Sequence, residues 1–274
     1  MSLKVLFLGE IVGRAGLTAV KKFLPSFRQE EKIDLVVANA EGTTGGFGLG
    51  KNHALYLRKL GVDVVTVGEK GFFKKDLTEL MGKSAFLLRP ANFPPEVPGR
   101  GYRLTEINGQ KIAVISLLGQ NGFTRIHLNN PFHTMNYLLE KLKDNDTILV
   151  EFHAATTAEK QAMAHFLDGK AAVVAGTHSK ALTADADILP KGTGRITDTG
   201  RCGSLQSVGG FLPKTEIDKF LTGIPARSRE TAAGTEIQGA LFEIDGNRCL
   251  SAEIIRKPVT VAEADSSDRE AEEC

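Results

Sequence analysis

The sequence lacks the features that mark disulfide-rich secreted proteins and membrane proteins. It has no tryptophan, and its three cysteines, Cys202, Cys249 and Cys274, are odd in number and show no CxxC spacing. Such sparse cysteine indicates a reducing compartment and no disulfide framework. The apolar start of the chain is too short for a signal peptide and is interrupted by Glu10. No run approaches the roughly 18 apolar residues of a membrane helix. We therefore expect a soluble, cytoplasmic protein with no membrane partner.

The chain also has no excess of charge of either sign. Its 34 lysines and arginines stand against 33 aspartates and glutamates, which gives a net charge of +1. A protein that binds the nucleic-acid backbone over a broad face needs a strong basic excess. The composition therefore carries no strong nucleic-acid signature, although a local basic cleft stays open. With 274 residues, 42% of them hydrophobic, the chain is long enough for one large α/β domain with a sizeable core.

Hydrophobic periodicity predicts strands that alternate with helices through the first two thirds of the chain. Short β-rich runs predict strands over Lys4–Gly9, Leu35–Asn39, Val62–Val67, Thr147–Phe152 and Ala171–Ala175. Helical periodicity predicts helices over Ala15–Glu31, Lys51–Leu60, Phe72–Met81, Pro131–Lys143 and Thr157–Leu167. This alternation is typical of an α/β layered domain.

Two hairpins interrupt or follow this alternation. Asn108-Gly109 predicts a tight turn between strands Tyr102–Ile107 and Lys111–Leu118. Asp245-Gly246 predicts a second turn, between Glu236–Ile244 and Cys249–Ile255.

The last third of the chain loses the regular pattern. Gly192–Gly210 is rich in glycine and predicts irregular structure, and Thr215–Leu221 predicts a short helix. Residues 262–274 are acidic and nearly free of large apolar side chains, which is typical of disorder. We expect a single domain over residues 1–260 and a disordered acidic tail over 261–274.

Ionisable residues gather at the ends of the predicted strands. These residues are Glu10, Glu41, Glu69, Lys70, His153, His178 and Lys180. The carboxyl ends of parallel strands meet in one crevice, where ligands bind. Acids and histidines that converge there predict a metal site, whereas two lysines at the same place argue against one.

Several segments at these strand ends match a known family. They include FLGEIVGRAG, NAEGTTGGFGLG, TVGEKGFFKKDL, LLRPANFPPEVPGRG, VEFHAATTAEK and GTHSKALTADADILPKGTGRITDTG. On these segments the chain resembles the YmdB-like bacterial metallophosphoesterases, a branch of the calcineurin-like phosphoesterase superfamily, from Lys4 to about Ile255. The resemblance implies a calcineurin-like α/β fold, a two-layered β-sandwich flanked by helices. It also implies two metal ions and the hydrolysis of phosphodiesters, including cyclic nucleotides.

The resemblance assigns two metal positions, and one of them is degraded in this sequence. That position corresponds to Glu10, Glu41, Gly42 and Lys180. Gly42 has no ligand atom and the Lys180 ammonium has no lone pair, so we expect this metal to be absent. The other position corresponds to Glu41, Glu69, His153 and His178. This set of two carboxylates and two imidazoles suits zinc, manganese or iron, so we expect one divalent metal or none.

The two lysines predict charge compensation in place of the lost metal. Lys70 stands where the family has its catalytic histidine. Carboxylates crowded together without a cation repel one another, and an ammonium can offset that repulsion if each charge is paired. We expect Lys180 to pair with Glu10 or Glu41, and Lys70 to pair with Glu69 or Glu10.

These residues could instead be ordinary loop residues without a function, but this interpretation is weaker than that of a metal site. An isolated acid after a strand is usually an exposed loop residue. The family motifs argue against such an exposed role for Glu41, His153 and His178. They argue against it less strongly for Glu10 and Glu69, which differ from the residues of the family. The other histidines carry no motif and predict surface or packing roles.

Two functions are consistent with the altered site. The substitutions favour a pseudoenzyme, a phosphoesterase scaffold with a binding or regulatory role toward a nucleotide ligand or an unknown protein partner. The alternative is a weak phosphodiesterase with a single metal that acts on cyclic nucleotides or other phosphodiesters. Replacement of the catalytic histidine by Lys70 would slow it further. A homo-oligomer stays open, since folds of this size often form symmetric assemblies.

Overall fold

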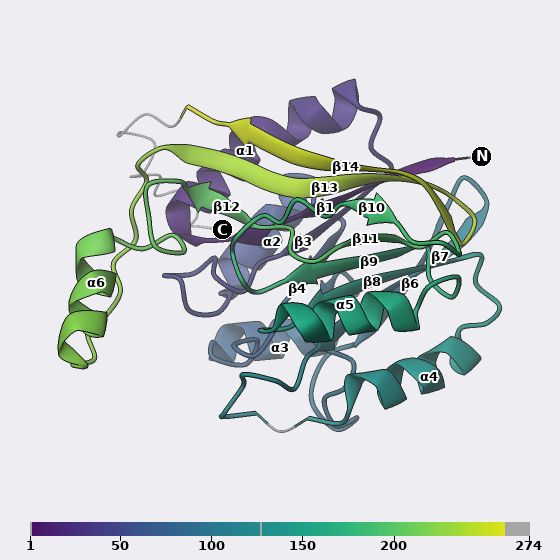
Figure 1. The fold of residues 1–274 in the computed structure, drawn as a ribbon, viewed down its shortest axis with the longest axis horizontal. Coiled ribbons are helices and arrows are strands. Elements are labelled where there is room, and N and C mark those ends of the chain that lie inside the picture. The colour runs from purple at the N-terminus through teal and green to yellow at the C-terminus, as the bar shows by residue number, and fades with distance from the viewer. Residues whose placement is uncertain (1, 127, 261–274) are drawn as a thin grey trace.

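The fold is a sandwich of two β-sheets with helices on its outer faces (Figure 1). The computed structural model describes residues 2–126 and 128–260. Within them the first sheet has eight strands, in the order β2 (Glu10–Ile11), β12 (Arg201–Ser204), β13 (Thr235–Asp245), β1 (Leu3–Leu8), β3 (Leu35–Asn39), β4 (Val64–Thr66) and β5 (Leu87–Leu88), with β14 (Arg248–Pro258) paired to β13. The second has six, in the order β10 (Asp187–Ile188), β11 (Gly194–Ile196), β9 (Val173–Thr177), β8 (Thr147–His153), β7 (Gln110–Leu118) and β6 (Tyr102–Ile107).

Alternation along the strands divides the core into layers. In β1, Val5 and Phe7 face the second sheet, whereas Leu6 and Leu8 face the helices on the outside. This follows from the two-residue period of a strand, which sends successive side chains to opposite faces. Phe7 meets Phe242 of β13 edge to face, with ring centroids 5.9 Å apart. Both rings lie in a buried apolar cluster with Val114 and Leu149 of the second sheet, which forms the core between the sheets.

Helices cover both outer faces of the sandwich. The outer face of the first sheet packs against α1 (Gly13–Glu30), α2 (Lys51–Lys59) and α3 (Lys75–Lys83). The outer face of the second sheet packs against α4 (Pro131–Lys141) and α5 (Thr157–Phe166). The predicted layered α/β architecture is confirmed, and it is the two-layered sandwich that the resemblance implied.

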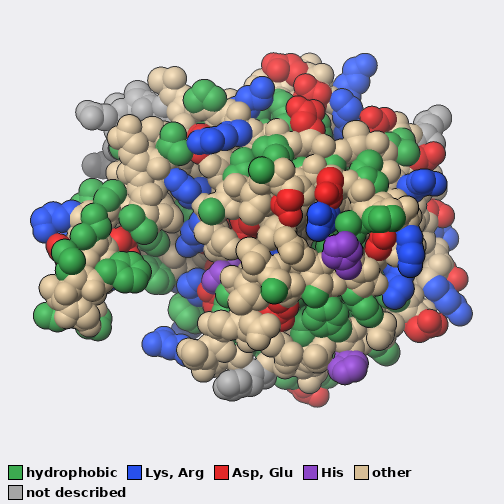
Figure 2. Space-filling model, in the orientation of Figure 1, with side chains coloured by type: hydrophobic (Ala, Val, Ile, Leu, Met, Phe, Trp, Pro, Cys, Tyr) green, Lys and Arg blue, Asp and Glu red, His purple; other side chains and the backbone are tan. Residues whose placement is uncertain are grey.

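One helix stands apart from these layers. Helix α6 (Pro213–Thr222) projects from the body and contains no buried residue. Phe220 and Leu221 on this helix are 89% and 78% exposed, and hydrophobic side chains gather over it in Figure 2. The short helix predicted over Thr215–Leu221 is thus present.

Most of the predicted elements are confirmed with shifts of a few residues at their ends. The two hairpins pair as predicted, β6 with β7 and β13 with β14. Asn108 and Gly109 have φ of 51° and 81°, the left-handed conformations that the first turn requires. The helix expected from Phe72 begins at Lys75 instead.

The prediction of irregular structure over Gly192–Gly210 is wrong in part. Strands β11 and β12 lie inside this range. They have three and four residues, too few to produce a period, and they form by pairing with β9 and β13, which are distant in sequence.

Other sequence-based expectations stand differently. The acidic tail over 261–274 lies outside the described residues. The single domain over 1–260 stays a prediction. In the two described stretches no helix has the length and apolar character to span a membrane.

Candidate metal centre

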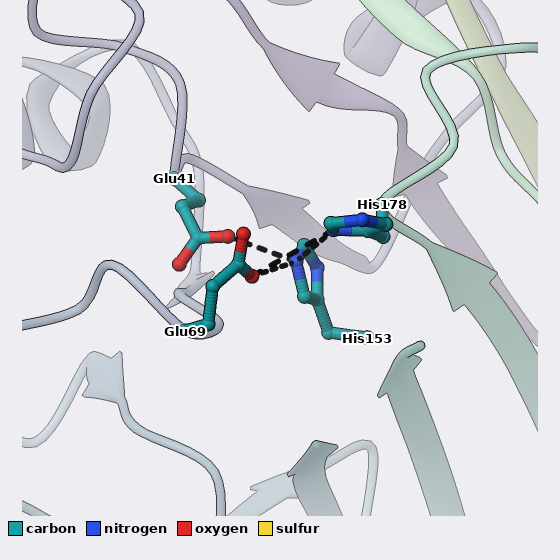
Figure 3. Close-up of side chains that lie close together, drawn as sticks. All are labelled: Glu41, Glu69, His153 and His178. Atoms are coloured by element: carbon teal, nitrogen blue, oxygen red, sulfur yellow. Dashed lines mark hydrogen bonds and ion pairs between the residues drawn. The ribbon is translucent and has the colours of Figure 1, made fainter. Parts of the chain in front are cut away.

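Four potential metal ligands converge at one end of the sandwich (Figure 3). Glu41 and Glu69 follow β3 and β4 of the first sheet, while His153 ends β8 and His178 follows β9 of the second. One donor atom from each residue lies within 4.8 Å of the others. The structure therefore brings together the set that the resemblance assigned to one metal, with two donors from each sheet.

The donor atoms surround the Nε2 atom of His153. This nitrogen lies 2.8 Å from Glu41 Oε2 and 2.9 Å from Glu69 Oε2. His178 Nδ1 lies 3.0 Å from the same nitrogen and 3.6 Å from Glu69 Oε2. Two carboxylate oxygens and two imidazole nitrogens that face one another form a donor set that zinc, manganese and iron accept.

A buried hydrogen-bond chain fixes the orientation of the His153 ring. His153 Nδ1 lies 2.8 Å from Thr177 Oγ1, and the Thr177 hydroxyl donates to Glu151 Oε1. Because the single hydroxyl proton of Thr177 points to Glu151, Thr177 accepts from His153, and Nδ1 carries the proton. Nε2 is then the ring nitrogen that faces the other donors. Partners of this kind behind a metal ligand hold its tautomer and its orientation.

Strand register creates this chain. His153 lies opposite Thr177 in the β8–β9 pair, and Ser116 lies opposite Glu151 in the β7–β8 pair. Glu151 also accepts hydrogen bonds from Ser116 Oγ at 2.9 Å and from Asn39 Nδ2 at 3.1 Å. Burial raises the pKa of Glu151, and these donors and His153 act against that shift.

The loop after β4 holds the second oxygen of Glu41. The backbone N–H of Gly68 donates to Glu41 Oε1 at 2.9 Å, and the N–H of Lys70 donates to the same oxygen. A Cβ atom on Gly68 would lie 2.2 Å from His153 Cδ2, so only glycine allows this loop to approach the ring so closely. These contacts leave Glu41 Oε2 to face His153.

The loop after β9 is held in an unusual backbone conformation. His178 and Lys180 have φ of 99° and 57°, a backbone region that residues other than glycine rarely adopt. The buried pair of Lys160 and Asp198 holds this loop, because Lys160 Nζ donates to Thr177 O at 3.0 Å and Asp198 Oδ2 accepts from Ser179 N at 2.9 Å. Backbone strain of this kind is typical of functional sites. Here it accompanies the placement of His178 beside His153 and of Lys180 beside Glu10.

The charges at the site are strongly coupled. Burial alone would lower the pKa of His153, but Glu41 and Glu69 outweigh it and raise the pKa well above its ordinary value. Burial raises the pKa of Glu41, with His153 opposing. Although burial also acts to raise the pKa of Glu69, its hydrogen bonds to His153 and His178 hold that pKa far below its usual range. Without a cation, a proton on His153 therefore lies between the two carboxylates.

At the position that the resemblance assigned to the other metal, a lysine and a glutamate form an ion pair. Lys180 Nζ lies 3.3 Å from Glu10 Oε1, with side chains that are 17% and 2% exposed. The expected ion pair between these residues is thus present. A Cβ on Gly42 would lie 2.6 Å from the same Glu10 oxygen. The Glu10 side chain therefore occupies the space next to Gly42, and the ammonium of Lys180 supplies the positive charge there.

Lys70 lies beside the candidate metal ligands. Its Nζ makes an ion pair with Glu69 Oε1 and lies 3.9 Å from Glu41 Oε2. Burial acts to lower the pKa of Lys70, but Glu41 and Glu69 outweigh it and raise the pKa. The expected pairing with Glu69 is present, and Lys70 keeps its positive charge at neutral pH.

Sequence reasoning missed the network behind His153. Glu151, Thr177 and Ser116 were not predicted as site residues. One signal was available, since Glu151 is a charged residue inside the apolar run ILVEF. The partners carry no such signal, because they depend on strand register.

Comparisons with known proteins agree with this geometry. Residues 6–256 match the family described as YmdB-like protein. This chain belongs to the YmdB-like family. It is 34% identical over 255 residues to the 2′,3′-cyclic-nucleotide 2′-phosphodiesterase of Bacillus subtilis, covering 93% of this chain and 96% of that protein.

Solved structures of similar size and shape support the same assignment. A crystal structure described as a novel phosphatase of Mycoplasma pneumoniae has a TM-score of 0.89 at 34% identity and covers 94% of each chain. A hypothetical protein of Thermus thermophilus has a TM-score of 0.89 at 35% identity and covers 94% of this chain and all of that one. The calcineurin-like fold expected from the sequence is confirmed. The names of the relatives support the phosphodiesterase alternative better than the pseudoenzyme.

Proposed function

We propose that this member of the YmdB-like family is a phosphodiesterase that works with one divalent ion and two lysines. The observation that supports it most is the convergence of Glu41, Glu69, His153 and His178, whose donor atoms lie within 4.8 Å of one another. The relatives named as phosphatases and phosphodiesterases support a phosphodiester substrate, and the Bacillus subtilis relative suggests a cyclic 2′,3′-nucleotide.

The four residues fit one ion by their chemistry. Because Thr177 holds His153 Nδ1, Nε2 is the nitrogen that a metal would take in exchange for its proton. Glu41 keeps Oε2 available because its other oxygen is held by backbone N–H groups. A divalent ion held there would act as a Lewis acid on a phosphoryl oxygen. The donor set is compatible with zinc, manganese or iron.

The ammonium of Lys180 supplies part of the positive charge that a second metal ion supplies in other members of the family. Its ammonium pairs with Glu10, and its side chain is 17% exposed and therefore partly open to solvent. An ammonium there can attract and orient a phosphate oxygen, as a point charge with three donors. It offers no open coordination position, so the chain loses the clamp that two ions form on a reacting phosphate.

Lys70 also supplies positive charge at the metal centre. The neighbouring carboxylates raise its pKa, so it holds its proton more tightly than a histidine would. A group whose pKa lies far above the working pH is a poor general acid, and replacement of a good one typically costs about 10²–10⁴-fold in rate. Lys70 therefore acts on the phosphate mainly by its charge, and we expect slow turnover.

Metal-dependent turnover tests this proposal. Protein stripped with a chelator should not hydrolyse bis(p-nitrophenyl) phosphate or a cyclic 2′,3′-nucleotide, and manganese or zinc should restore slow hydrolysis. His178→Ala should abolish the restored activity, whereas His165→Ala, on α5 and outside the donor set, should retain it. Elemental analysis of saturated protein should find about one ion per chain, the number that the surviving donors support.

The pseudoenzyme is the second candidate, and one observation favours it. Each lysine already forms an ion pair with a carboxylate, Lys70 with Glu69 and Lys180 with Glu10. These two pairs stabilise the site without metal. Protein that binds no metal and shows no turnover in the same assay would support this candidate. Two tightly bound ions per chain would contradict both.

A further inference from the structure

A cavity lies beside the edge strand β6, apart from the metal centre. It has a volume of about 1150 Å³ and lies between β6, α4 and the segment that joins β5 to β6. None of the candidate metal donors is among its lining residues in the described part of the chain. We name it the β6–α4 groove.

The groove is positively charged although the whole chain is nearly neutral. Arg89, Arg100, Arg103 and Lys141 line it, and the described lining includes no aspartate or glutamate. Arg89 donates to the carbonyl oxygens of Pro90 and Val97. Carbonyl groups carry no net charge, so these bonds orient the guanidinium and leave its positive charge in place.

Arg103 also retains its charge. It donates to the backbone carbonyl of Asp63, whose carboxylate pairs with Arg28 at 2.9 Å and with Arg58 at 3.0 Å. Arg100 and Lys141 are exposed at the surface of the groove. Several cations gathered in a concave surface concentrate an anion there.

Aromatic side chains line the same space. Tyr102 and Tyr137 lie beneath Lys141, whose Nζ is 5.4 Å and 5.8 Å from the two ring centroids. Tyr137 is 64% exposed, which leaves its ring open to a ligand. Aromatic faces beside basic side chains are typical of sites that bind nucleotides by base stacking and phosphate contacts. The volume of about 1150 Å³ slightly exceeds the roughly 300–1,000 Å³ of small-molecule sites, so a nucleotide fits with room for a neighbour.

We propose that the β6–α4 groove binds a nucleotide, with its phosphate at Arg100 and Lys141 and its base against Tyr137. The nucleotide is either free or the end of a single-stranded nucleic acid, since both present the same phosphate and base.

An aromatic contact links the groove to the loop of the metal centre. Phe93 lines the groove and meets Phe72 edge to face, with centroids 5.3 Å apart. Phe72 lies in the same loop as Lys70, two residues further along the chain. The groove and this loop are therefore joined by a single aromatic pair. Binding in the groove does not require the metal.

Binding to metal-free protein tests the proposal independently of hydrolysis. Fluorescence anisotropy in the presence of EDTA would follow fluorescein-labelled AMP and a short labelled oligoadenylate. Arg100→Glu and Lys141→Glu should each weaken binding by about tenfold or more, the usual loss of a charged hydrogen bond. Tyr137→Ala should weaken it by about tenfold through lost stacking. Lys59→Glu makes the same charge change on α2, outside the groove, and should change binding less than about twofold.

The two ligands separate the two sources of the nucleotide. Equal affinity for both probes indicates a mononucleotide site, and tighter binding of the oligoadenylate with a steeper salt dependence indicates a single strand; either result supports the groove. No binding of either probe at millimolar concentration would overturn the proposal. So would binding that is lost in Lys180→Met protein shown to be folded by circular dichroism but retained in Arg100→Glu, which would locate the ligand at the metal centre.

Discussion

Replacement of Lys180 by methionine should destabilise the protein through the charge it leaves on Glu10. The ammonium lies 3.3 Å from a Glu10 side chain that is 2% exposed. Removal of one partner from a buried ion pair typically costs about 3–5 kcal/mol, because the other charge stays buried without compensation. The 17% exposure of Lys180 lets water screen part of this loss. We therefore expect the free energy of unfolding to fall by about 2–4 kcal/mol.

Urea denaturation of metal-free protein measures this change directly. In a thermal melt the melting temperature should fall by roughly 5–15 °C, at about 2–4 °C per kcal/mol for a chain of this size. Glu10→Gln in the Lys180→Met background removes the uncompensated charge and should recover part of the loss, which a double-mutant cycle quantifies. Lys214→Met is the matched control, because Lys214 pairs with Asp218 at 2.7 Å with side chains that are 80% and 50% exposed. Its effect should stay within about 0.5 kcal/mol. Equal effects of Lys180→Met and Lys214→Met would refute the reasoning.

Three further predictions concern the same site. Gly42→Asn alone should lower the melting temperature, since its Cβ would lie 2.6 Å from Glu10 Oε1, and the shorter side chain in Glu10→Asp should relieve that clash in the double variant. Equal melting temperatures for the single and the double variant would contradict this. Thr177→Val removes the acceptor of His153 Nδ1 and should weaken metal binding by roughly 10–100-fold in calorimetric titration; an unchanged affinity would exclude this role for Thr177. Metal affinity should rise with pH above about 6.5, because a metal must displace the proton that the raised pKa keeps on His153. The stability of metal-free protein should change in the opposite sense: the contribution of protonated His153 is complete below the unfolded pKa of about 6.5 and is lost as pH rises through the higher folded pKa. Thermal melts with and without metal across this range would reveal either trend, and a pH-independent affinity would count against His153 as a ligand.

The candidate metal ligands could be predicted from the sequence because each follows a strand at a motif of the family. Glu41 comes directly after the apolar run LVVANA, and His178 comes after AVVAGT. In such cases the end of a strand fixes the position of the next side chain. The pairing of Lys180 with Glu10 could also be predicted, since the resemblance assigns both positions to the same metal.

The rest of the site depends on how distant strands align. Thr177 reaches His153 because the two residues are opposite each other in the β8–β9 pair, and a shift of one residue would turn Thr177 to the other face. Short strands such as β11 and β12 form only when their neighbours are in place. Neither register nor such short pairings leave a period in the sequence. The volume of the β6–α4 groove likewise arises from three segments that pack together, and no single segment predicts it.

The division of the four donors between the two sheets makes the site sensitive to the whole sandwich. Glu41 and Glu69 move with the first sheet, and His153 and His178 move with the second. The spacing of the donors thus depends on the apolar layer in between, where Phe7 and Phe242 of the first sheet lie in one buried cluster with Val114 of the second. A smaller side chain in that layer would change the separation of the sheets and thereby the size of ion that the donors can hold. Selectivity for a metal is in this sense a property of the core of the protein as well as of the residues that touch the ion.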